Sequence, residues 1–495
     1  MKHKFLRMLS LGLVALMLLT VFASCAKSDE ETGSDGTELI LGEDTTQKNA
    51  FEASGLEKRT FDGKEMNIWY CTEGGWAPGP MAVTSEEYAT GDVIKQAGYN
   101  RNVYLQEEFD LTLNFIPNAI NASGSGAGDA LEELRGLYNS GDSDKLDMVV
   151  ANARACGILA QEGFYYDLNE SEYIHSDSFY YEAQMNEQVE YFGKQYFASG
   201  YFNTQNTTAL SVMFVNYGIL ESISQGYITL DTLYKKALDH TWTFEYMLTS
   251  GKDYATPLQN EGDNWKTNKY SLIVSSGYDF PLYYDLGGTI LEYDNNQGTY
   301  VCTVQDTKNQ DLLTYLQTVL GMNADVGILT NDSPGPNGLK AGAAPYVYGT
   351  FYYLQFFTDA TVKWTTMPSP LYEEGEDYRS FSASGNLNFA GIPTNCADTD
   401  KASYLYEVFM AYSYDYVYPA YYEKCFQTRY QPTSESAQVF DIIAGSRVVC
   451  MAEIFRLYSD TSIKKMIGYD LDPIGSGTTV IADTVNAAME QKGWK

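Results

Sequence analysis

A glutamate, two glycines and a tryptophan follow an apolar run near the start of the sequence, in TEGGW at residues 72–76. Glycine has no Cβ, so Gly74 and Gly75 would let the backbone come close to a bound molecule. The Glu73 carboxylate could accept hydrogen bonds from hydroxyl groups, and the Trp76 ring could cover an apolar face. The stretch predicts part of a small-molecule site; the alternative is an ordinary turn with Trp76 on the surface.

The aromatic content points to the same chemistry. Tyrosine accounts for 42 of the 495 residues, beside 23 Phe and 6 Trp. A tyrosine ring has a flat apolar face and a polar tip, and most of these rings must pack at half-buried positions. An excess of this size still favours a ligand with apolar faces and hydroxyl edges, such as a sugar. Such a site also needs Asp, Glu, Asn or Arg, because an unpaired buried polar group costs about 1–3 kcal/mol.

Composition excludes several other classes. The net charge of −33 argues against nucleic acid as a partner and against binding to an anionic membrane by charge. The chain has only three histidines, and its seven cysteines show no zinc-ligand spacing, so we expect no metal and no cofactor. Apart from Cys25, we expect the cysteines to be mostly buried free thiols, with room for one or two disulfides.

The first 24 residues have the layout of a secretory signal, with three positive charges before an apolar run at 9–22. The sequence VFASC at 21–25 resembles a bacterial lipobox, with Phe22 in place of the usual leucine. It predicts cleavage before Cys25, which brings the net charge to −36, and acylation of Cys25 as a membrane anchor. The alternative is an ordinary cleaved signal. Residues 25–60 are polar and predict a disordered, acidic tether that carries the acylated cysteine.

Apolar runs alternate with stretches of helical spacing from about residue 64. This alternation predicts βαβ units and a mostly parallel sheet, and an Asn/Gly turn predicts a hairpin over 289–304. The predicted strands lie at 65–71, 111–117, 145–152 and 209–220, and the predicted helices at 86–110, 128–142, 153–163, 231–252, 309–322 and 401–426.

Eight stretches resemble, in order, segments of the extracellular solute-binding proteins of ABC importers, in the carbohydrate-binding class of maltose-binding protein. They are MNIWYCTEGG (66–75), YLQEEFDLTLNF (104–115), LDMVVANARACGILAQEGFYYDLNE (146–170), MFVNYGIL (213–220), HTWTFEYMLTSGK (240–252), GYDFPLYYDLGGTILEYDNNQGTY (277–300), GLKAGAAPYVYGTFYYLQF (338–356) and VKWTTMPSP (362–370). The chain departs from the family pattern at Tyr217, where lysine is usual.

The resemblance implies an α/β, two-lobed periplasmic-binding-protein-like fold of type II, with a hinge and an inter-lobe cleft. We expect lobe I at 61–214 plus 361–400, and lobe II at 215–360 plus 401–495. The implied function is capture of an extracellular solute, a sugar or oligosaccharide, and its delivery to the permease subunits of an ABC importer. We expect a monomer on the extracellular face of the cell membrane, held there by its lipid anchor.

The resemblance also implies further ligand-binding residues beside Glu73 and Trp76. Asn152 and Arg154 follow the third strand, where the family places polar contacts; the alternative is a helix cap and a solvated arginine. Tyr278 and Phe280 match a region of aromatic contacts, although they could belong to a packed loop. Phe351 and Tyr352 stand where the family often has a stacking tryptophan.

Other functions remain open. The chain has no G-x-S-x-G, H-E-x-x-H or P-loop pattern, and with 65 acidic residues a pair of carboxylates will occur by chance. We therefore expect that the protein is not an enzyme; a secreted glycan-active enzyme is the first alternative. A sensor lipoprotein that binds a peptide or a polyamine is the second alternative.

Overall fold

A computed structural model describes residues 49–73, 79–121, 127–256, 265–275, 277–321, 327–329, 334–357, 360–422, 433–458 and 474–494. Residues 48–495 form one compact unit, to which the following description applies. The predictions for the signal segment and for Cys25 lie outside the described residues.

The first sheet has the strand order β12-β3-β1-β2. Strand β1 (Lys64–Glu73) runs parallel to β2 (Leu111–Asn121) and β3 (Met148–Asn152), which confirms the predicted parallel sheet. Strand β12 (Asn388–Gly391) pairs antiparallel with β3. Alternate residues of β1, β3 and β12 enter two different apolar cores, which explains the apolar residues on both faces of these strands.

The second sheet has the order β10-β4-β9-β5-β8. Its strands are β4 (Ser211–Asn216), β5 (Leu272–Val274), β8 (Ile328–Leu329), β9 (Tyr346–Thr350) and β10 (Trp364–Met367). Strands β5, β8 and β9 are parallel, whereas β4 is antiparallel to both of its neighbours. The predicted hairpin is confirmed as β6 (Leu291–Asp294) and β7 (Thr299–Cys302).

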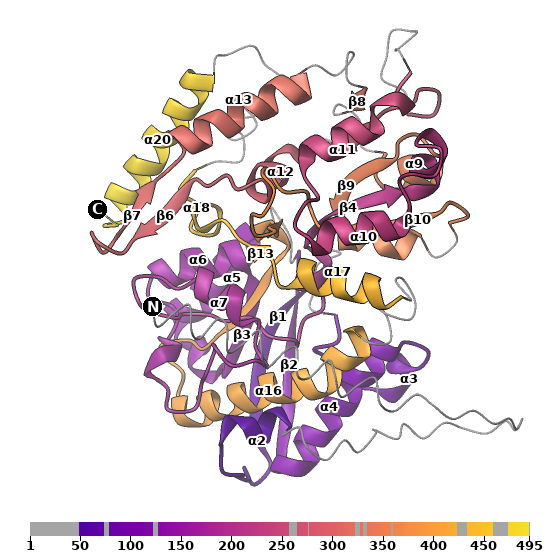
Figure 1. The fold of residues 1–495 in the computed structure, drawn as a ribbon. Helices are drawn as coiled ribbons and strands as arrows, with labels where there is room; N and C mark the ends of the chain where they lie inside the picture. The colour runs from indigo at the N-terminus through magenta and orange to yellow at the C-terminus, as the bar shows by residue number, and fades with distance from the viewer. Residues whose placement is uncertain are drawn as a thin grey trace, which may run out of the picture. The chain divides into compact units, whose positions relative to one another are not determined.

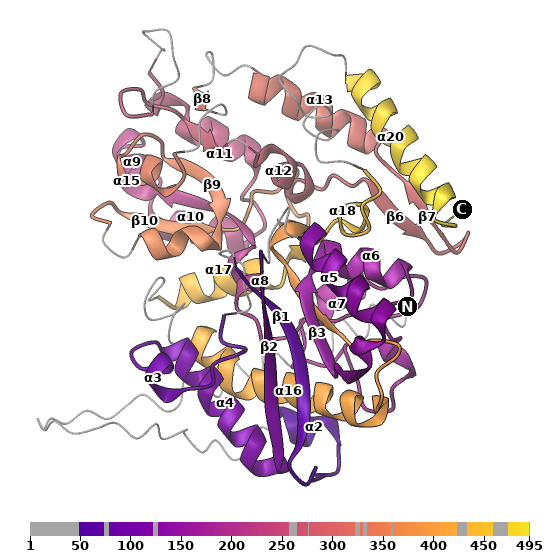
Figure 2. The ribbon, with the colours of Figure 1, turned by 180° about the vertical axis from the view of Figure 1, so that it is seen from behind.

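Helices cover both sheets, which lie one above the other in Figures 1 and 2. The side chains of α4 and α16 share a core with one face of the first sheet, and those of α5 and α6 share a core with the other. The helices are α2 (Ala50–Ser54), α3 (Glu86–Ala89), α4 (Val93–Phe109), α5 (Ala127–Ser140), α6 (Ala153–Gln161), α7 (Ala183–Gln188), α8 (Gln205–Thr208), α9 (Tyr217–Ile223), α10 (Leu230–Leu238), α11 (Phe244–Gly251), α12 (Asp279–Asp285), α13 (Thr307–Gly321), α15 (Pro336–Lys340), α16 (Thr399–Pro419), α17 (Ser434–Ala444), α18 (Met451–Ile454) and α20 (Ile474–Gln491).

Three described segments cross between the sheets and lie side by side. Leu210, just before β4, forms a bridge with Ser382. Strand β11 (Ser380–Phe381), which precedes β12, pairs in parallel with β13 (Arg447–Val448). The hydroxyl of Ser380 also donates to the carbonyl oxygen of Ser211 at 2.6 Å. The connections between the sheets are therefore hydrogen-bonded to one another.

Two predicted lobe assignments are wrong. Helix α16 packs against α4 and α2 of the first sheet, although residues 401–495 were expected in lobe II. Strand β10 pairs with β4 of the second sheet, although 361–400 was expected in lobe I. A helix apolar on nearly all sides, such as α16, carries no sign in its own sequence of which sheet it covers.

The prediction of a disordered tether over 25–60 is wrong for residues 49–60. Residues 49–60 are described, and Asn49 caps α2 through a hydrogen bond from Glu52 N at 2.7 Å. The Phe51 ring lies 5.5 Å from the rings of both Phe109 and Tyr412. The Phe51 ring, the Ala50 N–Asp415 bonds and the Arg59–Asp400 ion pair thus anchor a segment whose overall composition is polar.

Candidate functional site

Asn152 ends β3 and is buried. Its Oδ1 accepts a hydrogen bond from Arg154 N at 2.9 Å, and its Nδ2 donates to the Gly385 carbonyl oxygen at 2.7 Å. The first bond caps α6. The second ties the end of β3 to the segment before β12. Asn152 therefore acts as the helix cap that was the alternative to ligand binding, and its role toward a ligand stays a prediction.

Arg154 is 8% exposed, so the alternative of a solvated arginine is wrong. Its Nε donates to Ser384 Oγ at 2.9 Å, and its guanidinium forms an ion pair with Glu453, which is itself buried. A buried charge needs such a partner, because its desolvation is costly. The ion pair joins the start of α6 to α18.

Tyr278 and Phe280 lie at the start of α12, and both are half-buried. The Tyr278 ring is 6.0 Å from Tyr348 and 6.3 Å from Tyr353. The Phe280 ring is 5.5 Å from Phe381, in the crossing strand β11. The two predicted aromatic residues therefore lie in different surroundings. Tyr278 belongs to a group of tyrosines at the ends of β5 and β9, whereas Phe280 packs on the crossing segment.

Phe351 and Tyr352 directly follow β9. Phe351 is only 2% exposed, and its ring lies 5.3 Å from Phe440 of α17. Tyr352 is half-buried and packs against Phe356 at 5.7 Å. Of the two, Tyr352 is the side chain that the described structure leaves partly accessible.

The remaining predicted residues lie at the end of β1. Glu73 is its last residue, and its side chain, like Trp76, lies outside the described residues. The sequence prediction missed Tyr353, which contacts Tyr278, and Glu453, the partner of Arg154. The aromatic run GTFYYL could have indicated Tyr353. No local pattern marks Glu453, because its partner stands 299 residues away.

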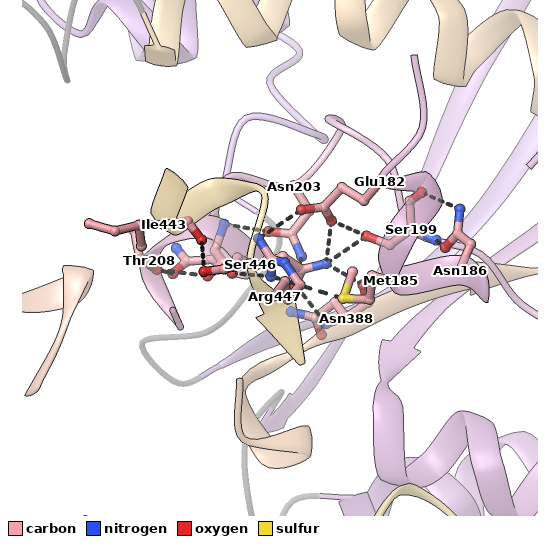
Figure 3. A network of polar contacts seen from close by, with 12 residues as sticks. Glu182, Met185, Asn186, Ser199, Asn203, Thr208, Asn388, Ile443, Ser446 and Arg447 are labelled. Carbon is pink, nitrogen blue, oxygen red and sulfur yellow. Dashed lines mark hydrogen bonds and ion pairs between the residues drawn. The ribbon is translucent and has the colours of Figure 1, made fainter. Parts of the chain in front are cut away.

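A second buried ion pair lies at the crossing segments (Figure 3). Arg447 Nη2 of β13 is 3.0 Å from Glu182 Oε1, and Arg447 Nη1 donates to the Asn206 carbonyl oxygen at 2.6 Å. Asn206 also receives a hydrogen bond from Asn388 N at 3.0 Å. The arginine on β13 is therefore coupled, through Asn206, to strand β12 of the first sheet.

Asp285 is the centre of a second buried hydrogen-bond network, beside the second sheet. Its Oδ2 accepts hydrogen bonds from the hydroxyls of Ser211, Tyr348 and Ser369 at 2.5–2.7 Å, and its Oδ1 accepts one from Phe381 N at 2.6 Å. Complete burial raises the pKa of this carboxyl to about 6, even though these donors favour the charged form. Asp285 thus holds the crossing strand β11 against β4 and β9.

Two cavities are evident in the described part of the chain. The larger, of about 960 Å³, is lined by residues of α7 and the following loop, α12, the β6–β7 hairpin, residues 371–379 and residues 446–451. The smaller, of about 290 Å³, lies between α16, α17 and α7, and Arg447 and five tyrosines contribute to its lining. Neither is lined by any of the predicted ligand-binding residues.

In the described part of the chain, no group of three or more His, Cys, Asp or Glu side chains could hold a metal ion. Within the same residues, no helix is long and apolar enough to cross a membrane. The five described cysteines, Cys71, Cys156, Cys302, Cys396 and Cys450, are free.

No protein-family profile matches the chain, and a search of curated protein sequences gives no match. Solved structures do match. The sugar-binding protein MalE from Xanthomonas citri is 9% identical, with a TM-score of 0.57, and the match covers 87% of this chain and 98% of that one.

A cyclic α-maltosyl-1,6-maltose binding protein from Arthrobacter globiformis is 13% identical, with a TM-score of 0.55 over 86% and 99% of the two chains. The galacto-N-biose/lacto-N-biose I-binding protein of the ABC transporter from Bifidobacterium longum is 12% identical, with a TM-score of 0.53 over 88% and 98%. This chain therefore has the two-lobed α/β fold of the maltose-binding-protein class of solute-binding proteins.

Proposed function

We propose that this chain is the substrate-binding component of an ABC importer and captures a sugar or oligosaccharide between its two lobes. The observation that carries the proposal is the shared fold: solved sugar-binding proteins match 86–88% of the chain and 98–99% of their own length. The proposal is capture and release of an unchanged ligand, without catalysis.

The described residues offer suitable groups at the ends of the strands. Ligands of open α/β sheets bind at the carboxyl ends of the strands. At those ends Tyr278 and Tyr352 are partly accessible aromatic rings, and Glu73 ends β1. Rings can cover the C–H faces of a sugar, while carboxylate and backbone groups bond its hydroxyls. Closure around the ligand would be a hinge motion about the crossing segments.

The partners follow from the same proposal. The closed, loaded form would be recognised by permease subunits in the membrane. Acylated Cys25 would keep the protein at the extracellular face of the cell membrane, within reach of that permease. Monomers suffice for this role, because one two-lobed chain encloses one ligand.

A thermal-shift screen tests the proposal. Residues 26–495 are heated with neutral oligosaccharides, with peptides and with polyamines in separate samples. A ligand at 100 times its Kd should stabilise the protein by about 2.7 kcal/mol. We expect a higher midpoint with at least one saccharide. A rise only with peptides or polyamines contradicts the sugar proposal, and turnover of a glycan without retention favours an enzyme.

A further inference from the structure

The larger cavity lies beside the crossing segments, and none of the ligand-binding residues predicted at the strand ends lines it. One wall is the loop after α7, which the Ala198 N–Ala390 O bond nearby joins to strand β12 of the first sheet. Another wall is the β6–β7 hairpin, and Val448 of β13 also lines the cavity. Small-molecule sites have volumes of about 300–1,000 Å³, so about 960 Å³ leaves room for a ligand of several rings.

The charges that line the cavity exclude one ligand class. Six carboxylates contribute to the lining, namely Glu187, Glu190, Asp285, Glu292, Glu376 and Asp377, against the two cations Lys308 and Arg379. Lys308 already lies 4.0 Å from Glu376. An anionic ligand would therefore meet net repulsion, while hydroxyl or ammonium donors would find acceptors.

Arg379 distinguishes between the two remaining ligand classes, those with hydroxyl groups and those with ammonium groups. Its Nε is buried and has no hydrogen-bond partner in the described part of the chain, although its Nη2 donates to the Gly288 carbonyl oxygen at 3.4 Å. The side chain as a whole is half-buried, and an aliphatic ammonium cannot accept a hydrogen bond from its guanidinium. A hydroxyl can accept from Arg379 and can also donate to the carboxylates.

Aromatic rings also line the larger cavity. Tyr293 is 42% exposed on the hairpin, and Phe192 and Tyr378 contribute to the same lining. These rings can cover the apolar faces of a sugar ring. We propose that this cavity is a second binding site of the protein, which takes a neutral, polyhydroxylated ligand of saccharide type. The proposal depends on the proposed function only for the choice of probe.

Occupation of this site would influence the relative position of the lobes. The two walls already touch, because Tyr300 Oη donates to the Glu190 carbonyl oxygen at 2.8 Å and the Phe192 and Tyr300 rings are 5.2 Å apart. A molecule that contacts both walls binds one arrangement of them better than others. The affinities of the cavity and of the strand ends must then be coupled, and the coupling is reciprocal.

Isothermal titration of residues 26–495 with maltotriose and with lacto-N-biose tests the site. Two variants change the cavity, Arg379→Met and Glu292→Gln, and their matched controls outside it are Arg135→Met and Glu221→Gln. Tyr278→Ala changes the ligand-binding site proposed at the ends of the strands. We expect two binding events. The Kd of one rises at least fivefold in both cavity variants and less than threefold in Tyr278→Ala. The Kd of the other rises at least fivefold in Tyr278→Ala, and both Kd values change less than twofold in the two controls.

Melting temperatures show whether each variant is folded. Glu292 is exposed, so Glu292→Gln should fold and still test the cavity if Arg379→Met does not fold. A crystal structure with maltotriose provides the second measurement, with density expected against Tyr293. Binding that only Tyr278→Ala weakens overturns this site and supports the strand ends. Binding that only the cavity variants weaken supports this site and contradicts capture at the strand ends. Absence of any saccharide binding overturns both.

Discussion

The guanidinium of Arg447 and the carboxylate of Glu182 lie 3.0 Å apart, and their side chains are only 5% and 9% exposed. The pair joins the crossing strand β13 to the segment that begins α7. Glu182 Oε2 also accepts hydrogen bonds from Ser199 Oγ at 2.5 Å and Asn206 Nδ2 at 3.2 Å. The pair is therefore the centre of a network that fixes the chain where the two sheets connect.

Removal of one member of this pair should destabilise the protein strongly. Arg447→Met leaves a buried, uncompensated carboxylate, so we expect a loss of about 3–5 kcal/mol in the free energy of unfolding. The double variant Arg447→Met/Glu182→Gln should recover part of that loss. Urea unfolding of the four proteins measures the coupling. The exposed pair of Lys363 and Glu221, 2.8 Å apart, is the control, and Lys363→Met should cost less than about 1 kcal/mol. Equal losses of stability at both pairs would contradict the conclusion that the buried pair of Arg447 and Glu182 matters more to the fold.

Asp285 should make the stability depend on pH. Burial raises its pKa to about 6 in the folded protein, above the value of about 4 in the unfolded chain. The folded state binds the proton more tightly, so this group stabilises the fold below about pH 4, and that contribution is lost as the pH rises through 6. The difference in unfolding free energy between wild type and Asp285→Asn should change by about 3 kcal/mol between pH 4 and 7. A flat difference would show that Asp285 does not titrate in this range.

Trp494 should be essential for the packing near the C-terminus. It is 1% exposed, and its ring lies 4.9–5.7 Å from Tyr191, Phe192, Tyr300 and Phe455. Trp494→Ala should cost about 3–5 kcal/mol in unfolding free energy, because a large buried side chain leaves a cavity. Tyr227→Ala, at a side chain that is 85% exposed, should stay within about 0.5 kcal/mol of wild type. A loss below 1 kcal/mol at Trp494 would mean that its ring does not pack among these four aromatic side chains.

Cys25 should carry the lipid. In cells that express the full chain and are fed an alkyne-bearing palmitate, the label should appear on the protein and the protein should be found in the membrane fraction. Cys25→Ser should remove both, since one hydroxyl cannot replace the acylated sulfur. Cys302→Ser should keep both, and a label that survives in Cys25→Ser would contradict the lipoprotein prediction.

Local patterns in the sequence predicted the elements well. Strands β1 and β3 of the first sheet were recognisable because they are buried on both faces, as Trp69 and Ile68 of β1 show by entering different cores. The β6–β7 hairpin was recognisable because Gly298 adopts a positive φ of 65° in its turn. Such signals depend only on neighbours along the chain.

Contacts between distant segments were not predictable in this way. Arg154 looked like a solvated or ligand-binding side chain, yet its partner Glu453 lies in α18. Phe51 looked like part of a polar tether, yet Phe109 and Tyr412 bind it. One sequence does not show which distant charge or ring will meet such a residue, and for this reason the candidate site was predicted less completely than the fold.

The three described crossing segments restrict how the lobes can move. Leu210, Ser382, Ser380 and Arg447 belong to neighbouring strands that are bonded side by side, so they form a narrow ribbon. Sliding one lobe past the other would stretch at least one of the three connections, and twisting would shear the bonds between them. Bending across the ribbon leaves all three lengths unchanged. Bending is therefore the easiest motion of the molecule, and a single distance between two labels, one beside each sheet, should follow it.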